Sequence, residues 1–190
     1  MVQDAGALTV SEYLIVGYDT VGQYEMHDGS LAADGIGVGA GMFYDGWRYR
    51  DPSASALVQG GGTCTTRELA VGGDYALHDG SLEVSEAADV RGRLVQSGGT
   101  ADLASLLLTG GDSLYALSGG TADVGTLTVD EASRCALSAG ALTIETALVL
   151  SGELDLAGDG EVRFLDGATG NFTAGQIVNA ASASMVAGAD

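Results

Sequence analysis

The sequence predicts an all-β fold, a right-handed parallel β-solenoid of about nine coils of roughly 20 residues with a roughly triangular cross-section. Two observations predict it: a glycine-marked motif that recurs along the chain, and apolar residues that alternate with polar ones inside each copy. Helical spacing of apolar residues is not sustained anywhere. Right-handedness follows from the general preference of parallel β crossovers.

The repeat is clearest in "YALHDGSLEV" (75–84) and "YALSGGTADV" (115–124). Glycines in equivalent positions are separated by 23, 33, 18, 19, 21 and 20 residues. These glycines are Gly6, Gly29, Gly62, Gly80, Gly99, Gly120 and Gly140. A period near twenty residues is typical of stacked repeat units. We expect one solenoid domain over residues 1–190.

Each unit is expected to hold three short strands. In one copy they are 115–117, 122–124 and 127–129, with a turn at 118–120 and a bend before the last strand. Alternation of apolar and polar residues predicts the strands, and glycine provides the positive backbone angles of the turn. One unit cannot bury its apolar face, so the coils must stack and line the interior with aliphatic columns.

The units "LVQSGGTADL" (94–103) and "YALSGGTADV" resemble the Gly-Gly-Thr repeats of autotransporter passenger domains and related large bacterial surface proteins. The resemblance covers about residues 4–156. It implies a parallel β-solenoid at the cell surface or outside the cell, acting as a spacer, adhesin or scaffold.

The charge of the chain is strongly negative. It holds 26 acidic residues against 7 basic ones, all arginine, which gives a formal net charge of −19. Binding to nucleic acid or to an anionic membrane needs positive surface, so neither partner is expected. The sequence shows no run long enough to cross a membrane and no signal-peptide pattern, and no membrane insertion is expected.

Residues 111–114 spell Gly-Asp-Ser-Leu, the motif that names the GDSL serine esterases. A serine nucleophile needs a base within hydrogen-bonding distance, and in those enzymes the base is a histidine downstream of the serine. No histidine follows Ser113 in this chain. We therefore expect a solvated turn serine and no catalytic residues, with Ser113 and Leu114 inserted in the turn after Gly110-Gly111-Asp112.

Histidines and cysteines give no metal or disulfide site. His27 and His78 occupy the same place in two units, with another unit between them, so they are expected about 10 Å apart, too far to share a zinc ion. Cys64 aligns with inward Leu82 and is expected to be buried, and Cys135 lies about four layers away, too far for a disulfide. No cofactor is expected. A calcium site in the acidic, glycine-rich segment 156–167 is the lesser alternative.

One segment, 39–56, interrupts the repeat as an aromatic-rich insertion. Insertions in solenoids leave as loops on one face and often carry recognition. Its candidate contact residues are Phe43, Tyr44, Trp47, Arg48, Tyr49 and Arg50. Aromatic rings beside arginine suit a glycan, a neighbouring subunit or the loop's own coil, and all three remain open.

The ends of the repeat show no capping helix. Open solenoid edges invite another strand. The first expectation is therefore a non-enzymatic structural protein, extracellular or on the cell surface, whose ends stack head-to-tail into a homopolymer. The alternative is a surface adhesin or carbohydrate-binding solenoid that uses the 39–56 loop. An enzyme that acts on polysaccharide comes third.

Overall fold

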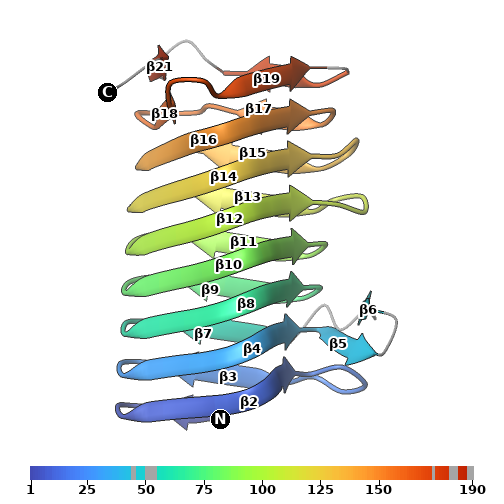
Figure 1. Ribbon diagram of the computed structural model, residues 1–190, viewed down its shortest axis with the longest axis vertical. Helices are drawn as coiled ribbons and strands as arrows, with labels where there is room; N and C mark the ends of the chain where they lie inside the picture. The colour runs from blue at the N-terminus through green and yellow to red at the C-terminus, as the bar shows by residue number, and fades with distance from the viewer. Residues whose placement is uncertain (44–45, 50–54, 173, 180–183, 188–190) are drawn as a thin grey trace.

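The computed structural model describes residues 1–43, 46–49, 55–172, 174–179 and 184–187. In these residues the regular structure is β-strand throughout, without a helix. The chain winds into a stack of about eight turns, against about nine expected from the glycine spacing. Figure 1 shows the stack, with β2 at one end and the strands β18, β19 and β21 at the other. The predicted parallel β-solenoid is confirmed.

One side of the stack is a parallel sheet of short strands, which we call sheet A. Each four-residue strand in its middle buries its second and fourth residues, as alternation predicted. In stacking order its nine strands are β1 (Val2–Gln3), β3 (Gln23–Met26), β7 (Ala56–Gln59), β9 (Asp74–Leu77), β11 (Arg93–Gln96), β13 (Leu114–Leu117), β15 (Arg134–Leu137), β17 (Glu153–Asp155) and β20 (Gln176–Val178).

The other side, sheet B, is built mainly of long parallel strands. Its path is β2 (Ala7–Val16), β4 (Ser30–Val38), β8 (Thr63–Val71), β10 (Ser81–Val90), β12 (Thr100–Leu108), β14 (Thr121–Val129), β16 (Ala141–Leu150), β18 (Glu161–Phe164) and β21 (Ser184–Ala187). A tenth strand, β19 (Thr169–Phe172), pairs with the second half of β16, while β18 pairs with its first half.

The expectation of three separate strands per unit is wrong in most coils, because the second and third form one continuous strand. In β10 the inward residues Leu82 and Val84 are followed by two exposed residues in a row, Ser85 and Glu86. The register with both neighbouring strands shifts directly after Val84. The expected bend is therefore present as an irregularity inside the strand.

The interior consists of columns of side chains from successive coils. Leu82 has Cys64 as its register partner on one side and Ala101 on the other, and all three are buried. Partner residues in the other columns are mostly leucine, valine and isoleucine that are at most 1% exposed. Apolar burial of this kind is the main stabilising term in the fold.

Polar side chains also enter the interior, as glutamine–tyrosine pairs on adjacent coils. The Tyr75 hydroxyl donates to Gln59 Oε1 at 2.8 Å, and the Tyr115 hydroxyl donates to Gln96 Oε1 at 2.8 Å. Tyr24 donates to Gln3 in the same way. Burial raises the pKa of Tyr75 and of Tyr115 well above the ordinary value, so both phenols stay protonated donors.

Each glutamine amide also ties its own coil to the next. Gln96 Nε2 donates to the carbonyl oxygens of Gly99 at 3.3 Å and Thr121 at 2.9 Å. Gln59 makes the equivalent bonds. No buried side-chain nitrogen or oxygen in the described part of the chain lacks a partner. The polar atoms inside the solenoid are thus satisfied between neighbouring coils.

The turn from sheet A to sheet B contains the repeat glycine. Gly99 has φ +66°. A Cβ at this residue would lie less than 3.0 Å from the carbonyl oxygen of Gly80 in the preceding coil. Two adjacent backbones approach too closely at this corner for any side chain. The period noticed in the sequence is therefore a requirement of coil stacking.

A double-mutant cycle tests the interior pairs. Replacing Tyr115 with Phe leaves Gln96 Oε1 buried without its donor, which should lower the free energy of unfolding by about 1–3 kcal/mol. Adding Gln96→Leu should cost less than the sum of the two single changes, because the unsatisfied oxygen is removed as well. Urea unfolding measures both. Strict additivity would contradict the pairing.

Candidate functional site

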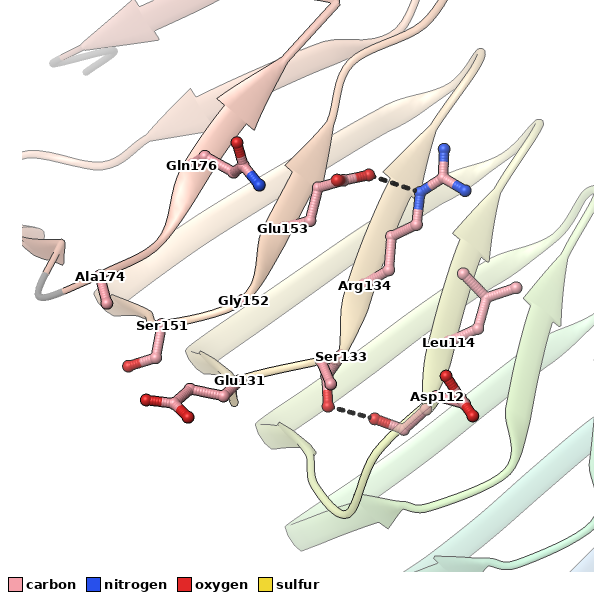
Figure 2. Close-up of a pocket in the computed structure, with 12 residues that line it drawn as sticks. Asp112, Leu114, Glu131, Ser133, Arg134, Ser151, Gly152, Glu153, Ala174 and Gln176 are labelled. Carbon is pink, nitrogen blue, oxygen red and sulfur yellow. Dashed lines mark hydrogen bonds and ion pairs between the residues drawn. The ribbon is translucent and has the colours of Figure 1, made fainter.

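A groove of about 720 Å³ runs along the corner where four strands of sheet A begin (Figure 2). The first residues of β13, β15, β17 and β20 line it in register. They are Leu114, Arg134, Glu153 and Gln176. Behind them lies a corner of small residues, among them Ser113, Ser133 and Gly152. The groove thus crosses four successive coils in the C-terminal half of the stack.

Arg134, the cation among the described residues that line the groove, is paired with carboxylates. Arg134 Nε lies 3.0 Å from Glu153 Oε1, and the same guanidinium contacts Asp155 Oδ2. Asp155 Oδ1 accepts a second hydrogen bond, from Asn179 Nδ2 at 2.8 Å. These contacts join β15, β17 and the residue that follows β20. These contacts hold three neighbouring coils together, and we call them the Asp155 tie. The guanidinium of Arg134 is already paired with two carboxylates.

Asp155 is a buried carboxylate, 3% exposed. Desolvation by burial raises the pKa of this group, but the hydrogen bonds from Asn179 and Arg134, together with the arginine charge, outweigh that effect. The pKa of Asp155 therefore lies below its ordinary value. In the two preceding coils the same register column holds alanine, at 136 and 116. An aspartate at a repeat position that holds alanine in the two preceding units is the sequence signal for this contact, and the sequence analysis did not use it.

Ser113 lies in the corner of this groove but is not a solvated turn serine. It is 1% exposed, and its hydroxyl bonds the Ser133 hydroxyl at 2.7 Å. The predicted insertion was also misplaced, because Leu114 is the register partner of Arg93, which pairs in turn with Asp74. Ser113 therefore corresponds to Gly73, and the extra residues lie before it. At Gly73 itself a Cβ would lie less than 3.0 Å from the backbone of Ser55.

The two histidines are remote from Ser113 along the solenoid. They directly follow β3 and β9, whereas Ser113 directly precedes β13. His27 Nδ1 lies 2.9 Å from Asp4 Oδ1, and His78 Nδ1 lies 2.8 Å from Ser97 Oγ. Strand β7 separates their coils, as expected from the repeat alignment. The serine in the motif thus has a hydroxyl partner and no imidazole beside it.

Both cysteines are free and buried, and burial of Cys64 was expected. Cys135 is the register partner of Tyr115. Burial raises the pKa of the Cys64 thiol to about 11 and that of Cys135 to about 12. Such thiols remain protonated and unreactive at neutral pH.

No group of three or more His, Cys, Asp or Glu side chains is placed to hold a metal ion in the residues described. In the segment considered for calcium, Glu161 pairs with Arg163 at 2.6 Å. The expectation of a chain without cofactor or metal stays a prediction.

The aromatic insertion contains an antiparallel hairpin, β5 (Ala40–Phe43) and β6 (Gly46–Tyr49), which extends sideways from the stack (Figure 1). Trp47 pairs with Met42 and Tyr49 with Ala40. Phe43 and Arg48 also lie on these strands, while Tyr44 and Arg50 fall outside the described residues. The contact role predicted for the six residues stays a prediction.

The outer face of sheet B carries carboxylates in register. Glu83, Asp102 and Asp123 are partners on three successive coils. Like charges at the spacing of adjacent strands repel one another, so this column costs stability and makes the face strongly anionic.

Comparison with protein-family models, with curated proteins and with solved structures finds no match. The fold is therefore established by the structure alone, and the surface-protein family suggested by the repeats is not shown. Among the described residues, no helix is long and apolar enough to span a membrane.

The Asp155 tie predicts a pH dependence. Because the pKa of Asp155 is lower in the folded chain than in the unfolded chain, its ionised form stabilises the fold above about pH 4, and this stabilisation is lost as the pH falls through the folded-state pKa. The difference in free energy of unfolding between wild type and Asp155→Asn should therefore shrink from pH 7 to pH 3. Urea unfolding at several pH values measures it.

The control is Asp112→Asn, which removes an exposed carboxylate from the same groove. It should change stability by no more than about 0.5 kcal/mol at pH 7. A difference between wild type and Asp155→Asn that stays constant with pH would contradict the proposed tie.

Proposed function

We propose that this chain is a non-enzymatic structural protein, extracellular or on the cell surface, whose solenoids stack head-to-tail into a filament. The observation that carries the proposal is the partial exposure of core side chains at the two ends of the stack. Leu8 and Leu14 in the first coil, and Phe164 and Ile177 in the last coils, pack on the core but stay partly exposed. Their counterparts in the middle of the stack are fully covered.

Exposed large apolar side chains support the same proposal. In the described residues they are confined to the first coil and the last coils. They are Met1, Val2, Ile15, Val21, Leu165 and Phe172. Apolar surface gathered at two places favours contacts there, because its burial releases water.

The sides of the rod favour separation instead. The formal net charge is −19, and the outer face of sheet B contributes stacked carboxylates. Arg67 offsets part of this charge, since it pairs with Glu86 at 3.4 Å and Glu68 at 3.8 Å. Side-by-side rods would therefore repel one another at low salt, while end contacts remain open.

A structural role also agrees with the chemistry of the groove. Ser113 is bonded to another buried serine, and Arg134 is neutralised by Glu153 and Asp155. Both thiols are buried with raised pKa values. The serine and arginine contacts join neighbouring coils, which supports a structural role.

The second candidate is a surface adhesin or glycan-binding solenoid. The hairpin β5–β6 favours it, because it extends from the stack and holds Trp47 and Tyr49 two residues apart on one strand. Aromatic side chains stack on sugars.

Negative-stain electron microscopy and sedimentation velocity of the purified chain test the proposal. We expect rods several times longer than one chain, lengthening with concentration, single at low salt and bundled near 1 M salt as the charges are screened. A monomer that persists at high concentration would contradict it. Glycan binding that disappears in Trp47→Ala/Tyr49→Ala would favour the second candidate.

A further inference from the structure

The first coil differs from the later coils in what lies beside its corner glycine. At each later repeat glycine, a Cβ would lie less than 3.0 Å from backbone of the preceding coil's corner glycine or the residue before it. These positions are Gly29, Gly62, Gly80, Gly99, Gly120 and Gly140. At Gly6, where φ is +88°, nothing lies within 4 Å of the same point. The position that a Cβ of Gly6 would occupy is therefore open, on the side where the later coils have a preceding coil.

Backbone hydrogen bonds at this corner follow one direction. The amide after each later repeat glycine donates to the glycine carbonyl of the preceding coil, at 2.8 Å for Ser30 to Gly6 and 2.9 Å for Thr100 to Gly80. In the first coil the corresponding amide belongs to Ala7. Its strand, β2, is a terminal strand of sheet B and has β4 as its neighbour. The Ala7 amide is thus placed to donate to one further coil.

The buried glutamine of the first coil, Gln3, already has its partners. Gln3 Nε2 donates to the carbonyl oxygens of Gly6 and Ser30 at 3.0 Å each, and Gln3 Oε1 accepts from Tyr24. All these partners lie in its own coil or the following one. A coil placed on the outer side would therefore leave the Gln3 hydrogen bonds intact.

The far end of the same chain offers a matching surface. The register column that begins with Val10 and Ala33 continues through Phe164 to Ala187, and the column that begins with Leu8 and Leu31 continues through Val162 to Met185. Strands β20 and β21 are the terminal strands there. Because the same columns reach both ends, a second copy shifted along the axis brings like positions into contact.

We infer that the end formed by β1 and β2 is the docking surface for a second copy of this chain, whose β20 and β21 extend sheets A and B, with Gly6 admitting the close backbone approach. This inference rests on the proposed filament and identifies its joint. The joint has a fixed polarity, because one end supplies the open glycine and the Ala7 amide.

The test uses matched glycine substitutions. Gly6→Asn adds a side chain at a positive-φ position that is open in the single chain and would be blocked in the joint. Gly110→Asn is the control: its φ is +75°, and its nearest neighbour, the Arg91 side chain, lies 3.8 Å from the added Cβ. Asn tolerates this backbone region better than most residues. Both variants should therefore fold, with similar melting temperatures.

Sedimentation velocity then gives the result. Wild type and Gly110→Asn should form filaments at the same concentration, whereas Gly6→Asn should stay monomeric at ten times that concentration. If Gly6→Asn assembles like the wild type, the inference is overturned and the filament survives. If the wild type stays monomeric, the proposed function is overturned and the joint with it.

A second variant guards against a Gly6→Asn chain that does not fold. Ala7→Pro removes the amide that would donate to the second copy, and edge strands tolerate proline at such positions. It should fold and stay monomeric. A folded Ala7→Pro chain that assembles at the wild-type concentration would overturn the joint.

Discussion

The close approach of backbones at the glycine corner is the constraint on which the rest of this structure depends. Parallel strands in adjacent coils lie about 4.8 Å apart, and at this corner no room remains for a Cβ. Every later feature requires that the coils keep this spacing. The apolar columns, the register partners on the outer faces and the glutamine–tyrosine pairs are all contacts between one coil and the next.

Polar groups inside the solenoid make this dependence stricter. An isolated buried amide or phenol would destabilise the fold, whereas a glutamine on one coil and a tyrosine on the next satisfy each other. The buried carboxylate of Asp155 is satisfied in a similar way near the far end, by Arg134 on the preceding strand and by Asn179, which directly follows the next strand. The chain thus stabilises itself through contacts between neighbouring coils along one axis, and each terminal strand of the described sheets has such a neighbour on one side.

Much of this arrangement could be predicted from the sequence, because period and alternation are local properties. They were sufficient to place Cys64 inside and to separate the two histidines by one coil. The position of Ser113 was predicted wrongly because Gly110-Gly111-Asp112 is identical in sequence to Gly72-Gly73-Asp74. In the structure, strand pairing aligns Leu114, not Asp112, with Asp74 through Arg93. The Asp155 tie depends on side-chain contacts across coils, which spacing along one chain does not provide.

Disulfide trapping of register partners tests the stacking most directly. Asp102 and Asp123 are partners on adjacent coils, while Thr143 lies one coil further. Cysteines at 102 and 123 would have Cα atoms about 4.8 Å apart, within disulfide range, and cysteines at 102 and 143 would be about 10 Å apart. The native thiols are buried and should not compete. The account predicts rapid cross-linking of the first pair and none of the second; equal cross-linking of both pairs would contradict it.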